Sequence, residues 1–110
     1  MMCAEPALEI VAPFGGGCTV ELRGELDVDN ADRLAAEIRD VAHGKVVLLD
    51  LAGLSFIDAS GVRALATVRN VLAQDGRWLF IERPRPQVRR IIDLVERLQD
   101  EQLRSFGIVG

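Results

Sequence analysis

The N-terminal part of the chain alternates apolar and polar positions in the pattern of paired β-strands. The alternation is clearest in residues 18–26, whose apolar side chains share one face: Cys18, Val20, Leu22 and Leu26. Residues 8–12 form another strand-like run, and the glycine-rich segment 13–17 joins the two runs. A short glycine-rich link between strands is typical of a hairpin, so we predict an antiparallel pair.

A helical pattern follows in residues 27–44. Its apolar positions recur three and four residues apart and form one stripe: Ala31, Leu34, Ala35, Ile38 and Val41. Asp29 is the expected N-cap, and Asp32 lies in the first turn, where the helix dipole favours a negative charge. Gly44 is expected to end the helix.

Strands and helices alternate in the second half of the chain. Residues 45–51 form an apolar run without alternation, which predicts a strand covered on both faces. The next helical pattern ends at 74–76, a strand is predicted at 77–82, and a third amphipathic helix at 87–100. The tail, 103–110, is expected to hold a last short strand.

The predicted order is therefore β-β-α-β-α-β-α, with a further strand in the tail. Strand–helix–strand units imply parallel pairing with right-handed crossovers. The fold class is α/β, a mixed sheet of four to five strands with a hairpin edge, packed against amphipathic helices. The 110 residues correspond to a single domain without an internal repeat or linker.

Composition and charge restrict the classes of function that we expect for this chain. Apolar residues make up 49% of the chain and charged residues 27%, as in ordinary globular domains. The net charge of −4 disfavours general binding to nucleic acid. No apolar run approaches the roughly 18 residues of a membrane span, and the N-terminus lacks the pattern of a secretory signal. We therefore expect a cytoplasmic protein that binds neither nucleic acid nor membrane.

The cysteine, histidine and aromatic residues are predicted to have structural roles and no chemical one. Cys3 and Cys18 form no CxxC pair, and His43 is the only histidine, so no metal site is expected. Cys18 is expected in the core, Cys3 as a free terminal thiol and His43 on the surface near a helix end. Three aromatic side chains are also expected in the core: Phe56, Trp78 and Phe80.

The stretch FIDASGVRAL, residues 56–65, places an acid and a serine at the start of a helix. Asp58 or Ser60 can cap that helix, because both side chains accept a hydrogen bond from a free N–H group, and Gly61 allows a close backbone turn. Serine hydrolase chemistry is disfavoured because His43 is expected about 20 Å away, one strand length, and no GxSxG turn is present. Phosphate-binding motifs are also missing, so we expect no catalytic residue and no cofactor.

Phosphorylation of Ser60 is the remaining chemical hypothesis. Free N–H groups at a helix N-terminus favour a phosphate locally, so the modification need not unfold the domain. It would add about −1.5 to −2 charges beside Asp58. The acidic loop 27–29 is expected at the same end of the sheet, because both segments follow strand ends. On these residues alone, capping and phosphorylation both stay open for Ser60.

Four arginines in residues 82–90 suggest a nucleic-acid site only at first sight: Arg83, Arg85, Arg89 and Arg90. Acidic residues intervene and no aromatic residues interleave, so a solvated face with a role in partner binding is favoured.

Two motifs at this spacing resemble the STAS domain, and more narrowly the bacterial anti-sigma-factor antagonists. They are GELDVDNADRLAAEI at 24–38 and VVLLDLAGLSFIDASGVRALATV at 46–68. The resemblance extends from about Leu8 to Phe106, which we expect to be the core of one STAS domain spanning 1–110. Ala59 departs from the family, which often has a second hydroxyl there. Many relatives also continue into a last helix beyond the position of Gly110, so apolar surface on the sheet or the third helix is expected, and the oligomeric state is open.

The resemblance implies a function in partner switching. The unmodified antagonist binds an anti-sigma factor, a serine kinase with a histidine-kinase-like ATPase fold, and thereby frees the sigma factor. The kinase phosphorylates the antagonist, which then dissociates, and a PP2C-like phosphatase resets it. By this resemblance Ser60 is the phosphorylation site, and the partner-binding positions are Gly24, Asp27, Asp58, Ser60 and Gly61. The alternative is a STAS module of a transporter or stress-signalling assembly, in which Ser60 is only a helix cap.

Overall fold

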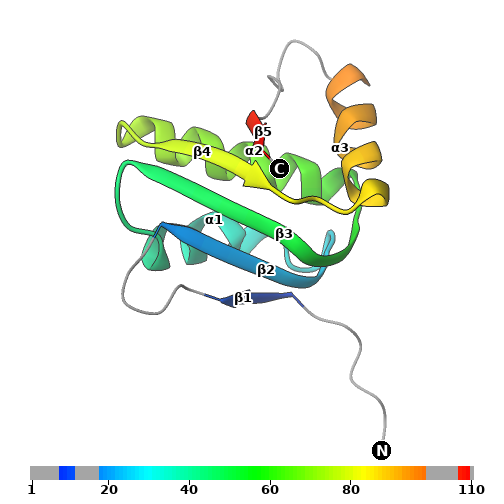
Figure 1. Cartoon of the computed structure of the whole chain (residues 1–110), viewed down its shortest axis with the longest axis horizontal. Coiled ribbons are helices and arrows are strands. Elements are labelled where there is room, and N and C mark those ends of the chain that lie inside the picture. Colours follow the sequence, from blue (N-terminus) through cyan, green and yellow to red (C-terminus); the bar gives the residue numbers. More distant parts are fainter. Residues whose placement is uncertain (1–7, 12–17, 99–106, 110) are drawn as a thin grey trace, which may run out of the picture.

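The computed structural model describes residues 8–11, 18–98 and 107–109 (Figure 1). In these segments the elements are β1 (Glu9–Val11), β2 (Thr19–Leu26), α1 (Ala31–Val41), β3 (Val46–Ile57), α2 (Ala59–Gln74), β4 (Trp78–Glu82), α3 (Pro86–Leu98) and β5 (Gly107–Val109). The strands form one sheet in the order β1-β2-β3-β4-β5. β1 is antiparallel to β2, and the other neighbours are parallel. The predicted α/β class and mixed sheet are confirmed.

The helices lie on one face of the sheet and at one end of it. α1 and α2 run side by side behind the sheet in Figure 1, and α3 packs against β3 and α2. No helix of the described segments covers the face turned toward the viewer. None of the described helices has the length and hydropathy needed to cross a membrane.

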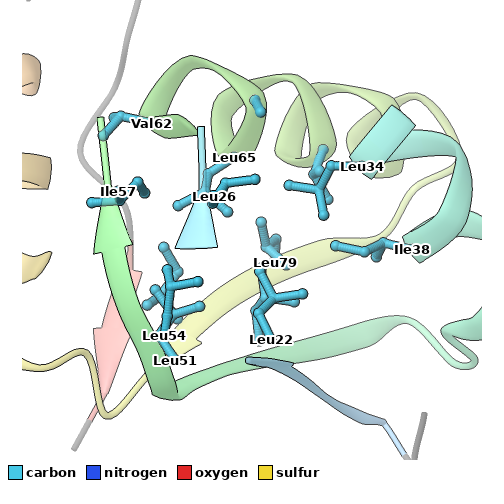
Figure 2. Close-up of a cluster of buried hydrophobic side chains, with 14 of the residues drawn as sticks. Leu22, Leu26, Leu34, Ile38, Leu51, Leu54, Ile57, Val62, Leu65 and Leu79 are labelled. Atoms are coloured by element: carbon cyan, nitrogen blue, oxygen red, sulfur yellow. The ribbon is translucent and has the colours of Figure 1, made fainter. Parts of the chain in front are cut away.

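The core fills the space between the sheet and the helices (Figure 2). Alternate residues of β2 and β3 point toward the helices, and the apolar stripes of α1 and α2 meet them. The largest side chains with almost no exposed surface include Leu22, Leu26, Leu34, Ile38, Leu49, Leu51, Leu54, Leu65, Leu72, Ile81 and Ile92. The stripe predicted for α1 therefore packs into the core, most deeply at Leu34 and Ile38, whereas Leu98, on the predicted apolar side of the third helix, is 74% exposed.

Three aromatic residues that were predicted in the core are not fully buried, two of them because they lie on the sheet face that no described helix covers. Trp78 is 65% exposed, Phe56 is 45% exposed and Phe80 is half-buried. Trp78 and Phe80 occupy the alternate positions of β4 that point away from the helices, which is why they are not enclosed. β3 is likewise not covered on both faces, because Val46 on the same side is 42% exposed. Cys18 precedes the first residue of β2 and is exposed rather than in the core.

Several boundaries differ from the prediction. α1 begins one residue later than expected, with Asn30 rather than Asp29 at the N-cap position. β3 continues to Ile57 instead of ending at residue 51, because it stays paired with β2 through two register shifts. α1 ends at Val41, so Gly44, with φ +86°, forms the following turn and does not itself end the helix. β5 confirms the strand predicted in the tail, whereas Cys3 lies outside the described residues.

Candidate functional site

Two loops meet at one edge of the sheet. Leu26, the last residue of β2, pairs with Ile57, the last residue of β3. The segments 27–30 and 58–60 therefore leave the sheet side by side, as the sequence predicted. The Asp58 N–H group donates a hydrogen bond to the Leu26 carbonyl oxygen at 3.4 Å and joins the two strand ends.

Asp58 caps α2, and Ser60 lies inside the first turn. The Asp58 carboxylate accepts a hydrogen bond from the Gly61 N–H group at 2.9 Å, and the Asp58 carbonyl accepts one from Val62 at 3.0 Å. Of the two predicted cap candidates, only Asp58 has this function. The Ser60 side chain is half-buried, and its hydroxyl makes no hydrogen bond to another residue in the described segments. The hydroxyl is therefore not committed to a structural contact.

Gly61 allows the start of α2 to approach the end of β2. A Cβ atom at this position would lie 2.6 Å from the Leu26 carbonyl oxygen and 2.6 Å from Ile57 Cγ1. Both distances are well below van der Waals contact. Gly61 thus fixes the position of the first helical turn, and with it the position of Ser60.

The loop between β2 and α1 is held by its own polar side chains. The buried Asn30 side chain donates to the Glu25 carbonyl at 2.9 Å and accepts from the Asp27 N–H group at 3.0 Å. The Asp27 carboxylate accepts from the Asp29 N–H group at 3.0 Å. Sequence reasoning missed Asn30, although an asparagine among acidic residues before a helix is a signal for such a bonded turn.

Gly24 shapes β2 just before this loop. Its φ is +99°, and the pairing register with β3 shifts between Gly24 and Glu25. The Ser55 hydroxyl donates to the Gly24 carbonyl at 3.0 Å. Among the predicted partner-binding positions, Gly24 is therefore a strand residue that sets the local bulge.

Ser60 lines a groove of about 310 Å³ between α1 and α2. Small side chains from both helices keep this groove open, and it is bordered by charges of opposite sign. Its lining residues are Val28, Ala31, Asp32, Ala35, Ser60, Arg63, Ala64 and Thr67. Val28 is 65% exposed, and neither it nor Arg63 was singled out by the sequence, because their place beside Ser60 depends on the contact between the two helices.

The arginines of residues 82–90 do not form one patch. Arg83 donates to the carboxylate of the buried Asp50, and Arg85 donates to the Ala52 carbonyl at 2.9 Å. The hydrogen bond and the negative charge of Asp50 raise the pKa of Arg83 above its already high ordinary value. These two arginines attach the loop before α3 to β3, whereas Arg89 and Arg90 lie on α3 itself.

The fold and the paired loops define a STAS domain. The STAS domain family matches residues 8–104, and the chain belongs to this family. No curated protein matches the chain.

Solved structures with this fold include two kinds of protein, anti-sigma factor antagonists and an anion transporter. The unphosphorylated anti-sigma factor antagonist SpoIIAA superposes with a TM-score of 0.63 at 21% identity, over 94% of this chain and 89% of that one. The phosphorylated form of SpoIIAA, from Bacillus, gives 0.56 at 22% identity, over 80% and 82%. SLC26A9 gives 0.69 at 17% identity, over 82% of this chain, which spans only 17% of that longer chain. At these identities the likeness shows the fold.

Proposed function

We propose that this STAS domain is an anti-sigma-factor antagonist and that phosphorylation of Ser60 switches its binding off. The observation that carries the proposal is the Ser60 hydroxyl, which lines an open groove and makes no hydrogen bond within the described segments. The family resemblance supplies the partners: a serine kinase with a histidine-kinase-like ATPase fold, which is the anti-sigma factor, and a PP2C-like phosphatase. The setting is the cytoplasm.

The domain contributes an acceptor, and the kinase supplies the chemistry. The bond between the γ-phosphorus of ATP and its leaving oxygen breaks, a new bond to Ser60 Oγ forms, and the hydroxyl proton passes to a base of the kinase. No general base of the antagonist is needed. In this mechanism the domain is a binding partner and not an enzyme, and it requires no cofactor.

Charge and volume both oppose binding after modification. The N–H groups of the first turn of α2, at Ala59 and Ser60, have no carbonyl partner within the helix, so they favour the phosphate locally. The phosphate adds about −1.5 to −2 charges beside Asp58 and in the same groove as Asp32. It also occupies space that a partner side chain would fill. Binding is lost without unfolding.

Four immobilised baits, the wild type and three variants, test the proposal. Wild type, Ser60→Ala and Ser60→Asp are incubated with lysate of the native host, and bound proteins are identified by mass spectrometry. Ala36→Asp is the matched control, because it adds the same charge on an exposed position of α1 outside the groove. We expect wild type, Ser60→Ala and Ala36→Asp to capture a kinase-like ATPase, and Ser60→Asp to lose it. Equal capture by all four contradicts the switch at Ser60.

A second candidate function follows from the similarity to SLC26A9. The murine form of SLC26A9 is an anion transporter, and the shared fold, with a TM-score of 0.69, favours a STAS module of a transporter assembly, in which Ser60 only occupies the first turn of α2. In that case the same experiment captures components of such an assembly with all four baits. Phosphopeptide mapping of the protein from its host then finds no phosphate on Ser60.

A further inference from the structure

α3 carries an exposed apolar stripe that is separate from the Ser60 groove. Leu94 is 48% exposed, Leu98 is 74% exposed and Ile91 is half-buried. Phe56, at the end of β3, is 45% exposed. We call these four residues, together with the bordering Arg90 and Arg97, the α3 surface. Single exposed apolar residues are ordinary, whereas an exposed contiguous set indicates an interaction site.

Helix geometry places the stripe on one side of α3. At about 100° per residue, Ile91, Leu94 and Leu98 fall within a sector of about 60°. A different sector faces the domain and holds the buried residues of the helix: Val88, Ile92 and Val95. Arg90 and Arg97 lie about 40–60° beyond Leu94 and border the stripe. Arg89 lies on the other side of the helix.

The stripe continues into a concave groove. A cavity of about 300 Å³ lies between the end of β3 and α3, and its lining includes Phe56, Ile91 and Arg90. The apolar surface therefore has a hollow at one end, which can receive a bulky side chain. Within the described segments, neither Arg90 nor Arg97 forms an ion pair.

We propose that the α3 surface binds an amphipathic helix of a partner protein, with apolar residues at i, i+3 and i+7 and acidic residues beside them. The apolar stripe matches the spacing of such a helix, and Arg90 and Arg97 match its acidic residues. This site is independent of the function proposed for Ser60. It assigns a role to Arg90 of the arginine cluster and to Arg97, which the Ser60 switch does not use.

The same observations disfavour two other occupants. A second copy of the chain related by a twofold axis would bring its own Arg90 and Arg97 to the interface together with a single carboxylate on the same flank, Asp93, about 40° beyond Arg97, so the positive charges would be in excess. An anionic membrane attracts clusters of about four to eight basic residues, and only two arginines border the stripe.

Titration of the whole, isotope-labelled chain with a designed peptide tests the proposal. The probe is a helical peptide with leucines at i, i+3 and i+7 flanked by glutamates, and its control carries lysines in place of the glutamates. We expect amide shifts confined to 55–57 and 87–98, and no binding of the lysine peptide. Arg90→Glu and Arg97→Glu each weaken binding by about tenfold at low salt, whereas Arg89→Glu, the matched control on the other side of α3, leaves it unchanged.

Other results overturn the proposal. Shifts at 60–67, or equal weakening by Arg89→Glu and Arg90→Glu, show that the α3 surface does not select the peptide. The chain could also self-associate in sedimentation equilibrium or co-sediment with phosphatidylserine vesicles. If Leu94→Gln abolishes either interaction, the α3 surface belongs to that other occupant. Ser60→Asp is expected to bind the peptide like wild type, so a failure here is distinguishable from a failure of the switch at Ser60.

Discussion

Replacing Gly61 with alanine tests how the start of α2 is fixed. The new Cβ would lie 2.6 Å from the Leu26 carbonyl oxygen, 2.6 Å from Ile57 Cγ1 and 3.0 Å from Leu26 Cγ. Carbon contacts are optimal at roughly 3.5–4.0 Å, so the first two distances are short by about 1 Å. The carbonyl oxygen cannot turn away freely, because it accepts the hydrogen bond from Asp58.

The expected loss of stability follows from two opposing terms. Overpacking of this kind costs about 1–3 kcal/mol, and the upper part of the range applies because one obstructing atom belongs to the backbone. Alanine gains at most about 1 kcal/mol over glycine from its helix propensity. The free energy of unfolding should therefore fall by about 1–2 kcal/mol, a decrease in Tm of about 4–8 °C for a domain of this size.

Urea denaturation followed by far-UV circular dichroism measures this change. Ser60→Ala is the control, since it places an alanine in the same helical turn but removes no hydrogen bond within the described segments. Its free energy of unfolding should stay within about 0.5 kcal/mol of wild type. If Gly61→Ala is as stable as Ser60→Ala, α2 can shift away from β2 and the argument that Gly61 positions Ser60 is refuted.

Three further predictions concern single side chains. Asp58→Ala should lower the free energy of unfolding by about 1 kcal/mol in the same denaturation assay, whereas Asp58→Asn, which retains a capping oxygen, should lower it much less. Asn30→Ala leaves the Glu25 carbonyl and the Asp27 N–H group unpaired and should cost about 1–3 kcal/mol, and wild-type stability would contradict the role of this turn. Trp78, the only tryptophan, should fluoresce as a solvent-exposed indole that iodide quenches efficiently, and blue-shifted, protected emission would show that the open sheet face is covered.

Local sequence patterns were sufficient to predict the order of the helices and strands and the position of Ser60 near the start of a helix. The spacing of Leu34 and Ile38 predicted the buried side of α1, and the alternation around Leu22 predicted the inner face of β2. These patterns are reliable because the period of an element and the need to bury apolar surface act on neighbouring residues. The motif around Ser60 was likewise visible as a contiguous segment.

Contacts between distant segments could not be predicted from such patterns. The exposure of Trp78 depends on which face of the sheet the helices cover. The apolar residues of β4 have the same sequence pattern whichever face is covered. The capping of α2 by Asp58 rather than Ser60 depends on where β3 ends and the chain leaves the sheet. Val28 and Arg63 belong to the Ser60 groove only because α1 and α2 pack together.

The sequence by itself determined the order of the elements, the buried sides of α1 and β2 and the position of Ser60 near the start of α2, because each of these depends on residues close together in the chain. Only the tertiary structure decided which residues form the open surfaces: the groove beside Ser60, the uncovered face of the sheet and the α3 surface. An open surface exists where no other segment packs, and packing joins residues that are far apart in the sequence.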